Sequence, residues 1–360
     1  MSLSRDNKLW FWLAGFGVFL VLLYVLSGIL LPFVAGMAVA YLLDPLAHRL
    51  ERLGLSRGQA TVVITLAFFL SVVLTILLLA PLVEDQVVGF AERVPAYVRQ
   101  LIHRAEPLWK SARTYLSPKD IEQLRTAGGE YAGTLAGWIA HFFSSLLTGS
   151  LAVVNVLSLV FIMPVVTFYL LRDWQGVTSR VDAWLPRPHA DIIRIQLGEI
   201  DRTLAGFVRG QAMVCLALGS FYAIGLTAIG LDLGLVVGFA AGVGSFIPYF
   251  GTISGFVISI ALALAQSPDW TLPGLVVGIF VVGNLLEGYV LAPKLVGEKI
   301  GLHPVWVIFA LLAGGTLFGF LGILLALPVT AVIGVLARFG LDQYLASTLY
   351  SGEAGESGAP

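Results

Sequence analysis

Long runs of apolar residues, separated by short polar stretches, dominate the chain. Eight runs approach the length of a membrane span: residues 9–27, 29–43, 60–83, 151–171, 211–231, 234–265, 272–291 and 304–339. A helix needs about 20 predominantly apolar residues to cross the hydrocarbon of a bilayer. The pattern therefore predicts an all-α, polytopic integral membrane protein with about eight transmembrane or re-entrant helices.

Two of these runs, 234–265 and 304–339, are too long for one straight crossing. Glycine and proline interrupt both, at Gly242, Gly244, Pro248 and Gly251 in the first and at Gly314, Gly315, Gly319, Gly322 and Pro328 in the second. Each run predicts a hairpin or a discontinuous helix. For 234–265 we favour re-entry, because a single crossing would place Lys294 and Lys299 outside, against the positive-inside rule.

The same rule predicts the orientation of the chain. Arginines cluster after the second run and again after the fourth, so both clusters should be cytoplasmic. This orientation places both termini in the cytoplasm of a multi-pass protein in a bacterial inner membrane. The predicted segments are N-terminal transmembrane helices (1–83), an extracytoplasmic amphipathic helical segment (84–150), a transmembrane helix (151–171), a cytoplasmic amphipathic segment (172–210), a C-terminal transmembrane bundle with broken helices (211–340) and a cytoplasmic tail (341–360).

The two polar segments have amphipathic patterns. In 84–116, apolar residues recur every three or four positions, with Pro95 and Pro107 as expected breaks. In the second segment, residues 185–188 should stop one helix before another leads into the membrane. Its basic and apolar faces suit contact with anionic membrane lipid. Alternatively, both segments pack against neighbouring subunits, and the expected partners are thus membrane lipid and further copies of the chain in a homo-oligomer.

Composition excludes several classes of protein. The chain is 58% hydrophobic and only 12% charged, which leaves too little polar surface for a water-soluble globule. The formal net charge of -1, from 21 basic and 22 acidic residues, gives no basic footprint for nucleic acid. Cys215 is the single cysteine, so the chain can form neither an internal disulfide nor a thiolate metal cluster. With no catalytic, phosphate-binding or dinucleotide motif, we expect no enzymatic activity, no cofactor and no metal site.

One ionisable residue stands inside an otherwise apolar span. Glu287 follows Asn284 by three residues within 272–291. A carboxylate at membrane depth is costly and suggests a functional site, either a proton carrier or a cation ligand together with Asn284. Two alternatives remain open: a buried structural hydrogen bond, for example to Tyr289 or to a neighbouring helix, and proximity to the lipid headgroups. Three other acids lie at run ends, where a solvated cap or turn is expected: Asp44, Asp232 and Asp269.

The interrupted stretch 242–255 is the second candidate. Its glycines remove side chains, and Pro248 removes a backbone donor and breaks the helical ladder. Freed carbonyls and helix ends there could bind ions or polar solutes, with Ser245, Tyr249 and Gly251 beside them. Close helix packing through glycines at spacing four is the alternative, although it does not explain why Pro248 and Tyr249 lie between them.

Several motifs, in order along nearly the whole chain, resemble the autoinducer-2 exporter family of permeases. They occupy residues 244–251 (GSFIPYFG), 287–297 (EGYVLAPKLVG), 301–304 (GLHP), 168–173 (FYLLRD), 210–211 (GQ) and 319–328. The resemblance implies an all-helical inner-membrane protein of about eight spans. Family members are associated with export of the signalling molecule autoinducer-2, and others with sodium/proton antiport. Pro248, Glu287, Pro293 and Gly297 match the family pattern.

Three functions follow as hypotheses. The first is a secondary transporter that exports a small polar solute similar to autoinducer-2, since no nucleotide-binding loop is present. The second is a monovalent cation (Na⁺)/proton antiporter, although antiport sites often use more than one buried acid. The third is an oligomeric membrane scaffold that binds a partner through residues 84–135. In the transport hypotheses the solute path lies between 242–255 and the span that carries Asn284 and Glu287.

Overall fold

The computed structural model describes residues 15, 17–18, 21–112, 150–296, 304–347 and 350. Within these residues the chain forms helices and turns and no strand. Five described helices are long and apolar enough to cross a membrane: Ile29–Arg52, Arg57–Phe90, Arg187–Ala228, Thr271–Leu295 and Val305–Leu345. The prediction of an all-α, polytopic membrane protein is confirmed.

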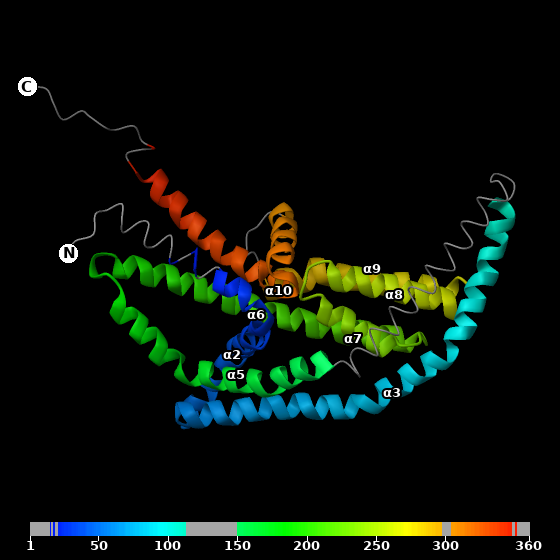
Figure 1. Cartoon of the computed structure of the whole chain (residues 1–360), viewed down its shortest axis with the longest axis horizontal. Coiled ribbons are helices and arrows are strands. Elements are labelled where there is room, and N and C mark those ends of the chain that lie inside the picture. Colours follow the sequence, from blue (N-terminus) through cyan, green and yellow to red (C-terminus); the bar gives the residue numbers. More distant parts are fainter. Residues whose placement is uncertain are drawn as a thin grey trace, which may run out of the picture. The chain divides into compact units, whose positions relative to one another are not determined.

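The helices and turns of the described residues follow one another in chain order (Figure 1). They are α2 (Ser27–Arg52), α3 (Arg57–Ala112), α5 (Ser150–Trp184), the 3₁₀ turn η1 (Arg187–His189), α6 (Ala190–Ala228), α7 (Gly234–Gly244), α8 (Phe250–Gln266), α9 (Thr271–Leu286), the π-helix η2 (Glu287–Val296) and α10 (Pro304–Leu345). The chain divides into two compact units. Unit 1 comprises residues 1–65, 161–210 and 296–360, and unit 2 comprises 66–160 and 211–295.

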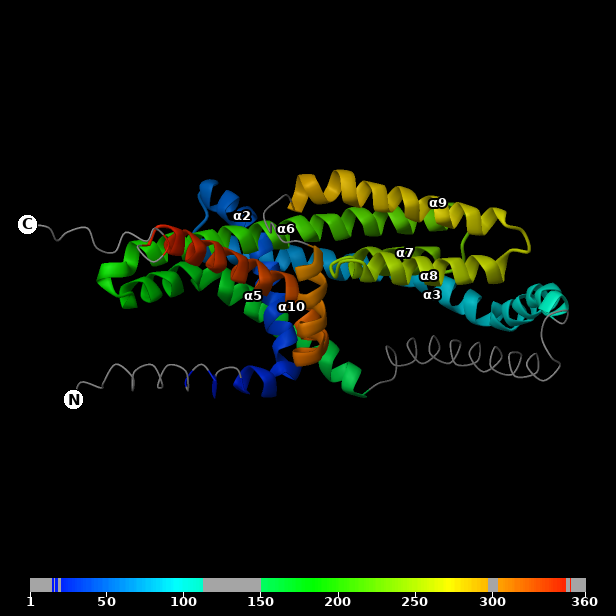
Figure 2. The ribbon, with the colours of Figure 1, turned by 90° about the horizontal axis from the view of Figure 1, so that it is seen from above.

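In unit 2 the run 234–265 is broken, as the glycines and Pro248 predicted. Helices α7 and α8 are joined by a turn over residues 245–249, and Gly255 lies against Ala241, so the two helices fold back on each other. Helix α8 contacts both α7 and α9, and Figure 2 shows α8 and α9 as roughly parallel ribbons with α6 between them in this view. With 11 residues, α7 is about 16 Å long and cannot span a hydrocarbon core of about 30 Å. The hairpin is the structure that re-entry requires, and its depth in a membrane stays a prediction.

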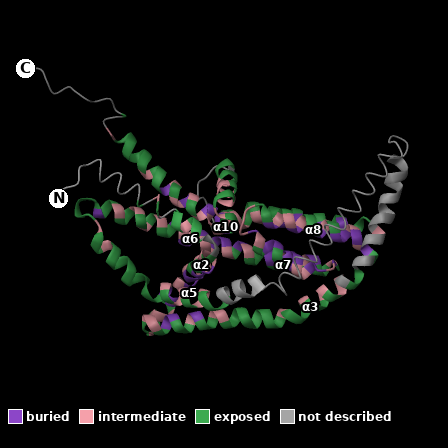
Figure 3. Ribbon diagram, viewed as in Figure 1, coloured by how far each residue is buried: buried purple, intermediate pink, exposed green. Residues whose placement is uncertain are grey.

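Glycine contacts hold α7 against α6. A Cβ atom at Gly242 would lie 2.0 Å from the Cα of Gly219, and one at Gly238 would lie 2.4 Å from the backbone nitrogen of Ala223. The buried residues of this part of the unit concentrate on α6, α7 and α8 (Figure 3). Small residues therefore let the backbones approach, which is the packing interpretation of the glycine spacing. Residues 234–265 therefore contain both a helix break and close helix packing.

In unit 1 the run 304–339 bends once. Gly319 has φ +58° and ψ −137° inside α10, a conformation open to glycine but strained for other residues. A Cβ atom at Gly314 would lie 2.4 Å from the carbonyl oxygen of Gly322, so the segments on either side of the bend touch (Figure 1). Pro328 lies inside regular helix, because the missing donor of one proline need not end a helix.

Two expectations about helix ends have opposite outcomes. The breaks expected at Pro95 and Pro107 are wrong: α3 continues through both to Ala112. A proline removes one hydrogen bond and bends a helix, but a long helix can tolerate it. The stop expected at 185–188 is confirmed, because α5 ends at Trp184 and α6 begins at Ala190.

Some predicted features lie outside the described residues. These are residues 113–149 of the amphipathic segment, most of the first apolar run, residues 351–360 of the tail, and Gly297.

Candidate functional site

Glu287 lies in unit 2, where α9 ends and η2 begins. The ten residues of η2 form a π-helix that contains Pro293. Wide helical turns of this kind are rare and frequently occur at functional sites. Pro293 has no backbone N–H and cannot complete a regular ladder, which gives the sequence-level reason for the altered helix.

The carboxylate of Glu287 faces the hairpin. The hydroxyl Oγ1 of Thr252, in α8, donates to its Oε2 atom at 3.3 Å. Glu287 is half-buried, and within the described residues no basic side chain pairs with it. A carboxylate in an apolar segment with one long hydrogen bond and no counter-charge is poorly compensated. Of the two structural bonds left open by the sequence, the structure shows the one to a neighbouring helix, through Thr252, and not one to Tyr289.

Aromatic side chains of α6 and α9 pack against each other near Glu287. Tyr222 is fully buried in α6 and stacks on Phe280, with ring centroids 4.6 Å apart. Its hydroxyl lies over Gly283, where a Cβ atom would come within 2.4 Å of the hydroxyl oxygen. Gly283 lies one helical turn before Glu287. Because it has no side chain, the ring and hydroxyl of Tyr222 can occupy the space above it.

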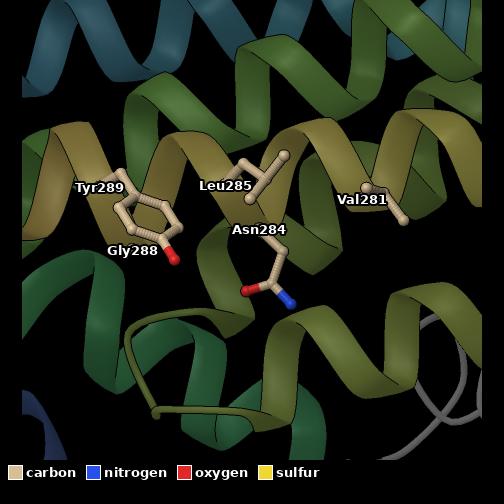
Figure 4. A pocket seen from close by; sticks show the side chains of 5 residues that line it. All are labelled: Val281, Asn284, Leu285, Gly288 and Tyr289. Carbon is tan, nitrogen blue, oxygen red and sulfur yellow. The ribbon is translucent and has the colours of Figure 1, made fainter.

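The side chain of Asn284 lines a surface depression and does not bond to Glu287. The depression is open and has a volume of about 460 Å³, and its described lining is Val281, Asn284, Leu285, Gly288 and Tyr289 (Figure 4). In Figure 4 the polar ends of Asn284 and Tyr289 point toward the same open space. Glu287 bonds instead to Thr252. In this arrangement Asn284 and Glu287 have different contacts, because the Thr252 hydroxyl bonds to the carboxylate from α8, and joint binding of a cation by the two residues stays a prediction.

The hairpin turn collects the other predicted residues. Ser245, buried at the end of α7, donates through its hydroxyl to Ala241 O at 3.0 Å. Its carbonyl oxygen accepts a 2.7 Å hydrogen bond from the Gln211 amide in α6. Tyr249 has φ +67° and is exposed, and Pro248 lies beside it in the turn. A Cβ atom at Gly251 would lie 2.1 Å from the Ser245 backbone nitrogen, so only glycine fits there.

The structure thus divides the predicted site residues. Ser245, Pro248 and Tyr249 lie in one turn, which Gly251 contacts from the start of α8, and Glu287 and Pro293 belong to the π-helix, with Pro293 exposed. Nothing in the sequence singled out Thr252 or Tyr222 as site residues, and Gln211 stood out only as part of the 210–211 motif. The last two lie on a helix far away in sequence, and Thr252 lies within the interrupted stretch without any charge or spacing to single it out.

A second polar cluster lies in unit 1, around Arg57. Its guanidinium donates to Leu171 O at 2.7 and 3.1 Å, to Asp44 at 2.9 Å and to Glu51 at 3.2 Å. The Arg57 side chain is only 17% exposed. The expectation that Asp44 is a solvated cap or turn is wrong. Asp44 lies inside α2, and its pairing with a distant arginine could not be read from local sequence.

Asp232 occupies the expected turn, between α6 and α7, but it is not simply solvated. Its carboxylate accepts hydrogen bonds from Arg93, at 2.6 and 2.7 Å, and from the hydroxyl of Tyr97. Burial of Tyr97, followed by its bond to Asp232, raises the pKa of the phenol to about 12. Gln266 accepts from the Asp232 N–H at 2.9 Å. The cluster anchors α3 to the turn within unit 2.

Comparison with known proteins assigns the chain to a family. Residues 12–341 match the AI-2E family transporter. The chain is 29% identical over 318 residues to a candidate transport protein, YrrI, of Bacillus subtilis strain 168, covering 87% of this chain and 86% of that protein. It is 25% identical over 320 residues to a candidate permease, PerM, of Escherichia coli strain K12, covering 89% and 88%.

A cyanobacterial relative gives the same assignment. The chain is 30% identical over 310 residues to the candidate transport protein sll0060 of Synechocystis, covering 84% of each chain. The chain therefore belongs to the AI-2E transporter family and is a multi-pass membrane transport protein.

Proposed function

We propose that this member of the AI-2E transporter family is a gradient-driven permease that exports a small polar solute similar to autoinducer-2. The observation that carries the proposal is the half-buried Glu287 carboxylate, which faces the broken α7–α8 hairpin with one hydrogen bond and no described counter-charge. Such a group is retained at a cost to stability, which favours a role in transport. The family assignment and the absence of a nucleotide-binding loop support gradient-driven movement.

The proposed path passes the α7–α8 turn and η2, both within unit 2. A discontinuous helix exposes backbone carbonyls and helix ends to a solute. Proton binding to Glu287 would change its hydrogen bonding, because an ionised carboxylate only accepts whereas a protonated one also donates. The 3.3 Å bond from Thr252 is the contact that this change would alter. Protonation and the arrangement of α8 against η2 are coupled in this proposal.

Flux in proteoliposomes tests the proposal. Purified protein is reconstituted in vesicles loaded with autoinducer-2, and efflux is compared between wild type and Glu287→Gln. We expect the variant to lose about tenfold or more in efflux. Glu199→Gln is the matched control, because Glu199 is an acid on α6 that pairs with Arg202 outside the proposed path. A correctly inserted wild type without efflux, or an equally active Glu287→Gln variant, would contradict the proposal.

Sodium/proton antiport is the second candidate. Glu287 and Thr252 offer a carboxylate and a hydroxyl oxygen, and such hard oxygen ligands suit a monovalent cation. Among the described residues no group of three or more His, Cys, Asp or Glu side chains could hold a metal ion. A transported cation would therefore bind one carboxylate and neutral oxygens. Sodium or potassium pulses on vesicles that contain a pH-reporting dye test this: proton movement abolished by Glu287→Gln supports antiport, and a silent wild type excludes it for those cations.

A deletion variant tests the scaffold hypothesis. Because α3 continues to Ala112 and holds Arg93 and Tyr97 against Asp232, a deletion of 84–135 would remove structural contacts. Deleting only 113–135 leaves these contacts in place. A scaffold loses its partner in this variant, whereas a transporter retains flux.

We further propose a bacterial inner-membrane location, cytoplasmic termini, contacts with membrane lipid and a homo-oligomeric state, without enzymatic activity. The single cysteine makes topology straightforward to test: in a Cys215→Ser background, Ser2→Cys and Ser357→Cys are labelled in intact cells with a membrane-impermeant maleimide. Both positions should be protected. Light scattering of the purified protein checks the oligomeric state, and a monomer would contradict this part.

A further inference from the structure

Unit 1 contains a cavity that the proposed transport site does not use. It has a volume of about 220 Å³. Helices α2, α5 and α6 and the first residue of α3 contribute its lining: Met37, Ala40, Tyr41, Asp44, His48, Arg57, Leu170, Leu171, Trp174, Gln175, Asp201, Ala205 and Arg209. Sites for drug-sized ligands measure about 300–1,000 Å³, so this cavity suits a smaller solute.

Charged groups of opposite sign bond to one lining residue, Tyr41, one at its side chain and the other at its backbone. The Tyr41 hydroxyl donates to Asp201 at 3.0 Å, and the Tyr41 carbonyl oxygen accepts from Arg209 Nε at 3.0 Å. Asp201 and Arg209 both belong to α6, roughly two turns apart. They do not pair with each other, so each faces the cavity as a separate charge.

The other lining charges are already compensated. Arg57 bonds to Asp44, Glu51 and the Leu171 carbonyl oxygen. In contrast, the terminal nitrogens of Arg209 form no hydrogen bond within the described residues, and Asp201 accepts only from Tyr41 there. A partly buried guanidinium with unused donors is costly, and a ligand carboxylate would satisfy it.

Aromatic and aliphatic side chains complete the lining. The rings of Tyr41 and Trp174 meet edge to face, with centroids 6.5 Å apart. Met37, Leu170 and Ala205 add apolar surface. An aromatic face and a carboxylate together favour a cationic group, and the apolar walls favour a hydrocarbon segment.

We propose that this cavity binds a small zwitterionic solute, with its carboxylate on Arg209 and its ammonium group on Asp201. Both charges of the ligand have an opposite partner, and its hydrocarbon segment lies along Tyr41 and Trp174. A ligand with only one charge leaves either Arg209 or Asp201 without an opposite charge from the ligand. The site is independent of Glu287.

Four probes of related structure test the charge requirement. Valine and 5-aminopentanoate are isomeric zwitterions, and pentylamine and pentanoate each lack one charge of the latter. Calorimetric titration of the full-length protein in detergent should show at least one zwitterion binding about tenfold or more tightly than both singly charged compounds. Equal binding of pentylamine or pentanoate, or no binding of either zwitterion, would overturn the proposal. The preferred isomer reports the separation of the two charges in the site.

Substitutions test which residue binds which charge of the ligand. Arg209→Gln should weaken zwitterion binding about tenfold while leaving pentylamine binding unchanged, and Asp201→Asn should do the same with pentanoate as the unchanged probe. Arg209→Lys keeps the charge and should restore part of the affinity. Controls are Asp191→Asn on α6, whose side chain is 90% exposed, and Arg180→Gln on α5. A variant that loses affinity for all four probes equally, with unchanged melting temperature, would contradict the assignment.

Discussion

Arg57 in unit 1 and Glu287 in unit 2 are both ionisable side chains in predominantly apolar helices, but their surroundings differ. Arg57 bonds to two carboxylates and a backbone carbonyl, each at 3.2 Å or less for its shortest contact. Glu287 accepts one hydrogen bond of 3.3 Å and has no described ionic partner. A compensated charge holds helices together, whereas an uncompensated one weakens the fold and is available for binding.

The difference has a practical consequence for interpreting membrane sequences. Both residues stand out by charge alone, but charge does not indicate which one is structural. The partners decide this, and they come from other helices: Asp44 and Leu171 for Arg57, and Thr252 for Glu287. Four substitutions test the comparison through protein stability.

The largest effect is expected for Arg57→Met. The substitution leaves Asp44 and Glu51 without their cation and Leu171 O without its donor. Breaking a fully buried ion pair costs about 3–5 kcal/mol, and because this cluster is part-buried we expect a loss near the lower end of that range. Chemical denaturation in detergent micelles measures the loss. Arg180→Met, at an exposed position on α5, is the control. A loss below about 1 kcal/mol, the range of surface pairs, would show that Arg57 is not the compensated structural charge described above.

Gly251→Ala should have the next largest effect, because it alters the hairpin that faces Glu287. The new methyl group would lie 2.1 Å from the Ser245 backbone nitrogen and 2.2 Å from Ala241 O, so α7 and α8 must separate. Overpacking of this kind costs about 1–3 kcal/mol. Gly274→Ala in α9 is the control, since nothing lies within 4 Å of its added carbon. Equal thermal stability of the two variants would disprove the close approach.

Tyr97→Phe should lower stability by about 1 kcal/mol at neutral pH, the usual contribution of one hydrogen bond. The folded-state pKa of Tyr97, about 12, lies above its ordinary value of 10.0. Its stabilising contribution is therefore complete below pH 10 and is lost as the pH rises through about 12. Melting curves from pH 8 to pH 12 should show wild type approaching the variant. Tyr169→Phe, at an exposed position, should show no such convergence.

Glu287→Gln should have the smallest effect on stability, although the largest effect on transport is proposed for it. The amide oxygen can still accept from Thr252, and the substitution removes a poorly compensated charge. We expect the unfolding free energy to stay within about 0.5 kcal/mol of wild type or to rise. A loss of about 3 kcal/mol would instead identify Glu287 as a structural charge like Arg57.

Much of the fold could be predicted from the sequence because apolar runs report membrane helices directly. The run 234–265 was expected to break, and α7 and α8 show the break. The stop before residue 190 was also expected. Proline was less informative: Pro95 and Pro107 lie within α3, because a proline bends a helix and ends it only when no other contacts hold it.

The charged residue of the candidate site could be predicted from the sequence, but the residues around it could not. Glu287 is conspicuous as an acid in an apolar span. Thr252 and Tyr222 are not, since hydroxyl and aromatic residues occur throughout such helices. The direction of Asn284, three residues from Glu287, also depends on what lies opposite each face of the helix.

Hydropathy, motif order and charge are properties of the linear chain, so the amino-acid sequence was enough to predict the membrane class, the family and Glu287 as an acid in an apolar span. Which charges have partners became visible only in the folded chain: Asp44 pairs with Arg57 and Asp232 with Arg93, and among the described residues Glu287 accepts a hydrogen bond from Thr252 alone. Distance explains this difference. Hydrogen bonds and ion pairs act over about 3 Å, and helices far apart in sequence bring these atoms together only on folding.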